Sequence, residues 1–262
     1  MECGRLFMVD LKKIENKNDF IKFKDKCISD LNKYIDNLKS ANYKQAVNLT
    51  YWLNSYSNYL KQEKTFNSIY RPVYKFGSVV EINLGFRLGS EFGGQHYGIV
   101  INKKDKKANP NLTIIPMRSM KENIRYTEVA IGSEFYNLAK NKVELLANEK
   151  TEMENNFIEK IKELEENLSN SDFENNKKYY ESELKELISQ KNSINSNIED
   201  LKSCLNRISK LKDGSIALPN QVLTISKMRV KDPIKTRDTL YGIVLSDSTM
   251  EKIKKGFDRI YF

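Results

Sequence analysis

The 262-residue sequence predicts an α+β protein whose small curled sheet or barrel is interrupted by a long helical segment. Three observations predict this: an amphipathic pattern near the start, short β-rich segments in two blocks, and a heptad pattern between the blocks. We divide the chain into a helical N-terminal extension, a first sheet part, an inserted helical hairpin, and a second sheet part with a closing helix: residues 1–70, 71–132, 133–213 and 214–262.

The N-terminal extension has apolar side chains at steps of three and four residues, which is typical of one face of an amphipathic helix. These are Phe20, Phe23, Cys27, Leu31, Tyr34 and Leu38. Residues 40–42 interrupt the pattern, and a second stripe runs from Val47 to Leu60. Its aromatic side chains could stack on single-stranded bases, but their helical spacing favours packing in a core: Tyr51, Trp52, Tyr56 and Tyr59.

Short segments rich in β-branched residues and bounded by Gly, Asn or Pro predict strands on both sides of the insertion. The expected strands are 78–84, 98–102, 111–117 and 126–131, then 215–218, 222–226 and 241–244. The last segment, 246–262, is expected to be a helix, because Ser246 or Asp247 can cap it and apolar residues follow at helical spacing.

The insertion carries a heptad pattern on both sides of a polar break at residues 169–176. The seam consists of Phe157, Ile161, Leu164 and Leu168, then Leu187, Lys191, Ile194, Ile198, Leu201, Leu205 and Ile208. This spacing predicts an antiparallel coiled-coil hairpin about 50–60 Å long, at 1.5 Å per residue. Lys191 at a seam position weakens one layer and can set the register. Because the hairpin interrupts the β-rich blocks, those two blocks must meet in space.

The charge distribution favours a polyanionic partner. The chain has 44 Lys and Arg against 35 Asp and Glu, a net charge of +9. Residues 146–212 contribute −3, with 11 bases against 14 acids, so the remainder carries +12. Such an excess favours nucleic acid or another polyanion, although a Lys-rich solubilising surface would give the same total.

The composition also sets expectations about location and cofactors. No apolar run approaches the ~20 residues that a membrane span requires, and residues 1–9 lack the apolar stretch of a secretory signal. The three cysteines, Cys3, Cys27 and Cys204, are widely spaced and form no metal-ligand pattern. We therefore expect a cytoplasmic protein with no membrane partner, no metal and no cofactor.

The residues most suited to chemistry lie in the first β-rich block. Five of the eleven glycines fall within residues 85–98, which is typical of a loop that approaches a ligand closely, although no phosphate-loop motif is present. This loop carries His96, the only histidine, and the strand expected at 111–117 ends beside Arg118 and Ser119. Cleaving RNA without a metal needs a base, a cation for the phosphorane and an acid. His96, Arg118 and Ser119 could jointly supply these, whereas the simpler interpretations are a structural histidine and a surface arginine.

Three stretches resemble the MazF/PemK-type toxins: GSEFGGQHYGIVIN (89–102), NPNLTIIPMRS (109–119) and SIALPNQVLTISKMRV (215–230). The closing SDSTMEKIKKGF is similar to the last helix of that family. The resemblance implies an SH3-like β-barrel, usually a homodimer. It also implies a metal-independent, sequence-selective endoribonuclease that a cognate antitoxin holds inactive. By position, His96 stands where the family has its catalytic Arg, Arg118 where it has its catalytic Thr, and Ser119 at the Ser beside it.

Other residues of these stretches are candidates for binding single-stranded RNA. The glycine-rich loop offers Arg87, Glu91, Gly93, Gly94 and Gln95, and the third stretch offers Thr224, Lys227 and Arg229. For Gln221 in the same stretch, we expect a buried amide that ties strands together.

Two other functions remain open from the sequence. The chain could be a non-cleaving RNA- or protein-binding module of the same fold, because two catalytic positions depart from the family pattern. It could also be a catalytically altered member that works through its coiled coil. The hairpin could dimerise, dock an antitoxin or reach an RNA-containing partner such as the ribosome. Its net negative charge favours contact with protein.

Overall fold

The structure is a computed structural model that describes residues 9–170 and 173–262, and it divides into two compact units. The first unit comprises residues 1–65 and the second comprises residues 66–262. The division therefore falls five residues before the boundary expected at residue 70. Residues 1–8, which include Cys3 and all but Val9 of the segment considered for a secretory signal, lie outside the described residues.

From residue 9 onward, the first unit consists of a short 3-10 helix, η2 (Ile14–Asn16), and two α-helices, α1 (Lys17–Ala41) and α2 (Tyr43–Gln62). The predicted break is confirmed, because Asn42 separates the helices and its side-chain oxygen accepts a hydrogen bond from the backbone N–H of Gln45 at 3.1 Å. This is an ordinary N-cap. The expected core is only partly present: α1 has no buried residue, whereas α2 buries Ala46 and Leu49.

Seven strands occur among the described residues of the second unit, after a 3-10 turn, η3 (Ser68–Tyr70). They are β1 (Val79–Asn83), β2 (Gln95–Val100), β3 (Asn111–Ser119), β4 (Val129–Gly132), β5 (Ser215–Ala217), β6 (Leu223–Ser226) and β7 (Val230–Asp232). Two further 3-10 turns, η4 (Pro219–Gln221) and η5 (Lys227–Arg229), lie on either side of β6.

Six of the seven expected strands are confirmed, although β4 begins three residues later than predicted. The prediction of a strand at 241–244 is wrong. That segment turns and contributes only an isolated bridge between Ser78 and Val244. The strand β7 was not expected, because three residues are too few to show an alternating pattern.

The strands form an antiparallel sheet in the order β4-β5-β3-β2-β1-β7, and β6 also pairs with β3. Within the described ranges no pairing joins β4 to β7, so the sheet is open where the resemblance implied a closed barrel. The long strand β3 pairs with β6 along its first half and with β5 along its last three residues. The two β-rich blocks therefore meet along β3, as their interruption by the insertion required.

Both faces of the sheet are covered. Alternate residues of β1 enter two separate apolar clusters, with Val79 in one and Val80 and Ile82 in the other. The first cluster includes Met250 and Ile253 of α5 (Asp247–Tyr261). The prediction of this closing helix and its cap is confirmed, because the Ser246 hydroxyl accepts the Thr249 N–H at 3.3 Å.

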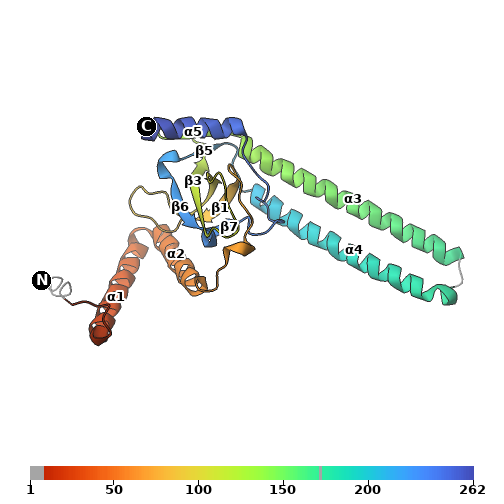
Figure 1. Ribbon diagram of the computed structural model, residues 1–262, viewed down its shortest axis with the longest axis horizontal. Helices are drawn as coiled ribbons and strands as arrows, with labels where there is room; N and C mark the ends of the chain where they lie inside the picture. The colour runs from red at the N-terminus through yellow and green to blue at the C-terminus, as the bar shows by residue number, and fades with distance from the viewer. Residues whose placement is uncertain (1–8, 171–172) are drawn as a thin grey trace. The chain divides into compact units, whose positions relative to one another are not determined.

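The insertion forms two long helices, α3 (Glu134–Asn170) and α4 (Phe173–Ile208). They leave the sheet side by side and run in opposite directions (Figure 1). Lys160 of α3 pairs with Glu183 of α4 at 3.1 Å. Residues 171–172, within the predicted break, lie outside the described residues.

The expected apolar seam is partly buried. Leu164 and Ile194 are buried between the helices, whereas Lys191 is exposed. At the end of α4 near the sheet, the expected seam residue Leu205 is exposed and its neighbour Cys204 is buried instead. No helix within the described residues is long and apolar enough to span a membrane.

Candidate functional site

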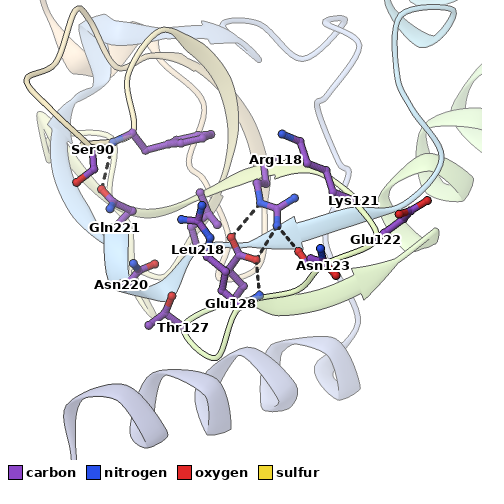
Figure 2. Close-up of a pocket in the computed structure, with 12 residues that line it drawn as sticks. Ser90, Arg118, Lys121, Glu122, Asn123, Thr127, Glu128, Leu218, Asn220 and Gln221 are labelled. Carbon is purple, nitrogen blue, oxygen red and sulfur yellow. Dashed lines mark hydrogen bonds and ion pairs between the residues drawn. The ribbon is translucent and has the colours of Figure 1, made fainter.

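A pocket of about 720 Å³ opens beside the end of β3 (Figure 2). Its walls come from the glycine-rich loop, the end of β3, the loop between β3 and β4, and the turn after β5. In Figure 2, Arg118 and Glu128 lie in the middle, Ser90 and Gln221 on one side, and Lys121 and Glu122 on the other. The lining residues are Ser90, Phe92, Arg118, Lys121, Glu122, Asn123, Arg125, Thr127, Glu128, Leu218, Asn220 and Gln221.

Arg118 is held by a two-point ion pair with Glu128. Its Nε donates to Oε1 at 3.0 Å and its Nη2 donates to Oε2 at 2.6 Å. The same guanidinium donates from Nη1 to the carbonyl of Ser119 at 3.0 Å. The side chain of Glu128 is 5% exposed and that of Arg118 is 17% exposed. The pair therefore fixes the guanidinium at the wall of the pocket and occupies its Nε–Nη2 edge, so a phosphate must displace a protein partner to bind it through two hydrogen bonds.

The carboxylate of Glu128 is ionised at neutral pH. The hydrogen bond from Arg118 lowers the pKa of Glu128, and the bond from the backbone N–H of Arg125 at 2.9 Å acts in the same direction. Burial opposes this shift, but the net direction is downward. The charge of Arg118 is thus balanced within the protein, which leaves Lys121 and Arg125 as the exposed cations of the pocket wall.

His96 lies on the same face of the sheet as Arg118. It is opposite Ile82 on β1, and β2 and β3 pair at Tyr97 and Met117. Continuing that register by one residue sets His96 opposite Arg118, and partners across an antiparallel pair point to the same face. The structure therefore does not separate the two side chains onto opposite faces.

Phe92 covers the imidazole of His96. The two ring centroids are 4.1 Å apart, and Phe92 lines the pocket whereas His96 does not. Burial lowers the pKa of His96 below its usual value of 6.5, against a smaller opposing effect of a hydrogen bond to the backbone of Gly93. The imidazole is therefore neutral at pH 7 and able to accept a proton.

The other loop candidates are mostly held by their own loop. The Nε of Arg87 donates to the carbonyl of Leu84 at 3.0 Å, and Arg87 also pairs with Glu91 at 3.6 Å. Gln95 donates to Glu81 on the neighbouring strand. Of the loop candidates, Glu91, Gly94 and Gln95 are exposed.

Gly93 and Gly94 define the shape of the glycine-rich loop. Gly94 has a φ of +94° and exchanges backbone hydrogen bonds of 2.7 Å with Leu84 and Gly85. A Cβ on Gly93 would lie 2.7 Å from the carbonyl oxygen of Gly85, so only glycine fits there without movement. The loop is consequently pinned at its closing end, directly before His96.

The remaining candidates differ in exposure. Ser119 is exposed at the end of β3, where it pairs in register with Ser215. Thr224 is exposed on β6, with its hydroxyl 3.1 Å from that of Thr113. Arg229 is half-buried and donates to the carbonyl of Asn83 at 2.8 Å. Of these three, none lines the pocket.

Lys227, which the sequence predicts to bind RNA, is buried in the structure. Its side chain is 0% exposed and its ammonium group pairs with Asp105 at 2.8 Å. It also donates to the carbonyl of Lys106 at 2.9 Å. The chain buries this cation because the turn η5 directs it inward against the loop between β2 and β3, which a pattern of basic residues does not reveal.

Sequence reasoning missed the residues that shape the pocket. Glu128 lies in an expected strand and Phe92 in the glycine-rich loop, and neither residue carries a sequence signal of its own. Gln221 was expected to tie strands together, and its Oε1 does accept the N–H of Phe92 at 3.2 Å. It is only half-buried, however, and its amide faces the pocket.

No protein-family model matches the sequence, and no curated protein is significantly similar to it. Among the described residues, no group of three or more His, Cys, Asp and Glu side chains is arranged to hold a metal ion.

Proposed function

We propose that this protein is a metal-independent endoribonuclease that cleaves single-stranded RNA in the pocket beside Arg118. The observation that supports this most is the fixed guanidinium of Arg118 at the wall of a pocket that also offers an aromatic ring and amides. The neutral imidazole of His96, on the same face of the sheet, supplies a base.

The pocket has the groups that bind an unpaired nucleotide. Phe92 offers a ring on which a base can stack, a contact worth about 1–3 kcal/mol per base. The amides of Asn123, Asn220 and Gln221 can donate to and accept from the edge of that base. Lys121 and Arg125 can bind the flanking phosphates.

In the proposed step, the 2′-oxygen attacks phosphorus and the bond from phosphorus to the 5′-oxygen breaks. His96 takes the 2′-hydroxyl proton and returns it through a water molecule to the leaving 5′-oxygen, so one proton is transferred overall. Arg118, which must exchange Glu128 for the phosphate, neutralises the extra charge on the phosphorane, and Lys121 donates to a phosphate oxygen. The products carry a 2′,3′-cyclic phosphate and a 5′-hydroxyl. The Phe92 ring must move aside as RNA enters, because it covers His96.

The resemblance to MazF/PemK-type toxins extends this proposal to the whole protein. In that account the open sheet corresponds to the SH3-like barrel of the family and the helices α3 and α4 form a coiled coil. The protein is then the cytoplasmic toxin of a toxin–antitoxin system. Its partners are a cognate antitoxin and a second copy of the chain. The three sequence stretches support this, and they contain or adjoin His96, Arg118 and Gln221.

Incubation of purified protein with end-labelled single-stranded RNA in EDTA tests the activity. We expect cleavage by the wild type and loss of cleavage in the His96→Ala, Arg118→Ala double variant. Because Arg118→Ala leaves Glu128 unpaired, the Arg118→Met, Glu128→Met variant should be assayed alongside it, with folding checked by circular dichroism. Equal cleavage by wild type and folded variants would place the chemistry elsewhere.

Two contacts favour a second function: Arg118 is already paired with Glu128, and His96 is covered by Phe92. A pocket in this state can bind RNA without cutting it. Salt-sensitive binding of RNA that remains intact after prolonged incubation would identify the protein as an RNA-binding module.

A further inference from the structure

We propose that single-stranded RNA extends from the pocket onto the helix α5, where Lys252 and Lys255 bind its phosphates. This inference rests on the proposed function, because it takes the pocket as the place where RNA binds. It assigns a backbone-binding surface on an element that carries none of the residues expected to contact RNA.

A second hollow, of about 420 Å³, lies between α5 and the start of β4. It is lined by Glu128, Val129, Ala130, Lys252, Lys255, Gly256 and Arg259. Glu128 lines both this hollow and the pocket, so the two adjoin at that residue. In Figure 2 the helix runs along the lower edge, and Thr127 and Glu128 lie between it and the rest of the pocket.

The sequence of α5 arranges three of its four cations on one face. Lys252, Lys255 and Arg259 are separated by three and four residues, which brings them to the same side of a helix. Gly256 lies on that side as well and contacts β4 so closely that a Cβ would overlap the Cγ2 atom of Val129. The cations are therefore held beside the sheet edge where the hollow opens.

Two of these cations are available for a ligand and one has a structural task. Lys252 and Lys255 are exposed, and neither forms a salt bridge within the described residues. Arg259 donates to the backbone carbonyls of Tyr126 and Glu128 and lies over the Tyr126 ring. It fastens the loop between the two hollows to α5.

The balance of charge favours a polyanion along this path. Together the two hollows are lined by six cations and two carboxylates; Arg118 and Glu128 neutralise each other, which leaves five cations and one carboxylate. A single strand has a phosphate at every nucleotide, so its backbone suits a row of cations that starts at a pocket for one base. An acidic protein segment would match the charges, but it has no base to stack on the aromatic ring of the pocket or to form hydrogen bonds with its amides.

Titrations with 2′-O-methyl RNA test this inference without interference from cleavage, because that RNA lacks the attacking hydroxyl. A tetranucleotide should occupy the pocket alone, whereas a dodecanucleotide should reach α5 as well. The variant is Lys252→Gln, Lys255→Gln. The matched control is Lys162→Gln, Lys254→Gln, which removes two exposed lysines outside the hollow.

We expect the variant to bind the dodecanucleotide several-fold more weakly and the tetranucleotide as the wild type does. Each phosphate contact on single strands contributes about 0.7 to the slope of log affinity against log salt. Losing two contacts should lower that slope by about 1.4. The affinity lost by raising salt from 50 to 200 mM should shrink by about sevenfold. The control should keep the wild-type slope.

An equal slope in the variant and the control would overturn the inference. So would a dodecanucleotide that binds wild type no better than the tetranucleotide does. In both cases pocket binding, and with it the proposed function, would stand. The same proteins can be titrated with an acidic peptide. If Lys252→Gln, Lys255→Gln loses peptide binding but binds RNA as the wild type does, α5 binds a protein partner and the inference is overturned as well. If the wild type binds neither RNA, both proposals fail.

Discussion

Arg118 and Glu128 meet through two hydrogen bonds, of 3.0 and 2.6 Å, at the wall of the pocket. Glu128 also accepts the N–H of Arg125, so one buried carboxylate orders both the end of β3 and the loop that follows it. Because the Nε, Nη1 and Nη2 groups of Arg118 all donate within the protein, a phosphate that binds this guanidinium must take the place of one of these partners.

This pair should matter for stability as well as for binding. Replacing Glu128 by Ala leaves the Arg118 guanidinium largely buried without a counter-ion, which should cost about 3 kcal/mol in the free energy of unfolding. The double variant Arg118→Met, Glu128→Met should lose much less, because apolar side chains of similar volume leave no bare charge. Urea denaturation measures both. Equal losses in the two variants would show that the ion pair is not what holds this loop.

The imidazole of His96 should set the acid limb of the pH–rate profile. Its pKa is lowered by burial, so the side chain stays neutral as the pH falls to 6.5 and is protonated only below that value. If His96 is the base, the cleavage rate should be level near pH 7 and fall below about pH 6.5. A His96→Gln variant should lose this limb together with most of the activity. An acid limb that persists unchanged in the variant would assign the base to another group.

The same shift has a consequence for stability. The pKa of His96 in the folded protein lies below its value in the unfolded chain, so the unfolded chain binds more protons at pH values between the two. Stability should therefore decline as the pH drops below about 6.5. His96→Gln should remove this contribution, as thermal unfolding between pH 5 and pH 7 would show.

Lys227 should affect folding and leave RNA binding alone. Lys227→Ala leaves the Asp105 side chain buried without its cation, which should destabilise the protein by about 3–5 kcal/mol. Removing the exposed Lys121 should instead weaken RNA binding with little effect on unfolding. A folded Lys227→Ala protein with normal stability and weakened RNA binding would contradict this assignment.

Gly93 should be needed for the shape of the loop. In Gly93→Ala the new methyl group would lie 2.7 Å from the Gly85 carbonyl oxygen, so the loop must shift and carry Phe92 with it. We expect weaker RNA binding, measured by anisotropy. Gly89→Ala is the matched control. Its φ of +56° costs about 1 kcal/mol, but its methyl group meets no atom within 4 Å. Equal RNA affinities in both variants would show that the loop does not position the pocket.

The sequence predicts most local structure because local signals decide it. Asn42 ends one helical pattern and caps the next, and Ser246 caps the last helix. Gly, Asn and Pro bound the strands on both sides of the insertion. The failures are in segments where pairing, not composition, selects the conformation: 241–244 has the composition of a strand but meets only Ser78 across an isolated bridge.

The candidate site was harder to predict because distant segments build it. His96 and Arg118 could be placed together from their strand ends, and the register agrees with this. Nothing local indicated that Glu128 would pair with Arg118 or that Phe92 would cover His96. Lys227 shows the same limit, since its burial follows from Asp105, which is 122 residues away in the chain.

End-group analysis of the products tests the central proposal most directly. Single-stranded RNA treated with wild-type protein in EDTA should yield fragments whose masses show a 2′,3′-cyclic phosphate on one side of each cut and a 5′-hydroxyl on the other. The folded Arg118→Met, Glu128→Met variant should yield neither. Intact RNA after treatment with wild type, or fragments that end in a 3′-hydroxyl and a 5′-phosphate, would contradict the account.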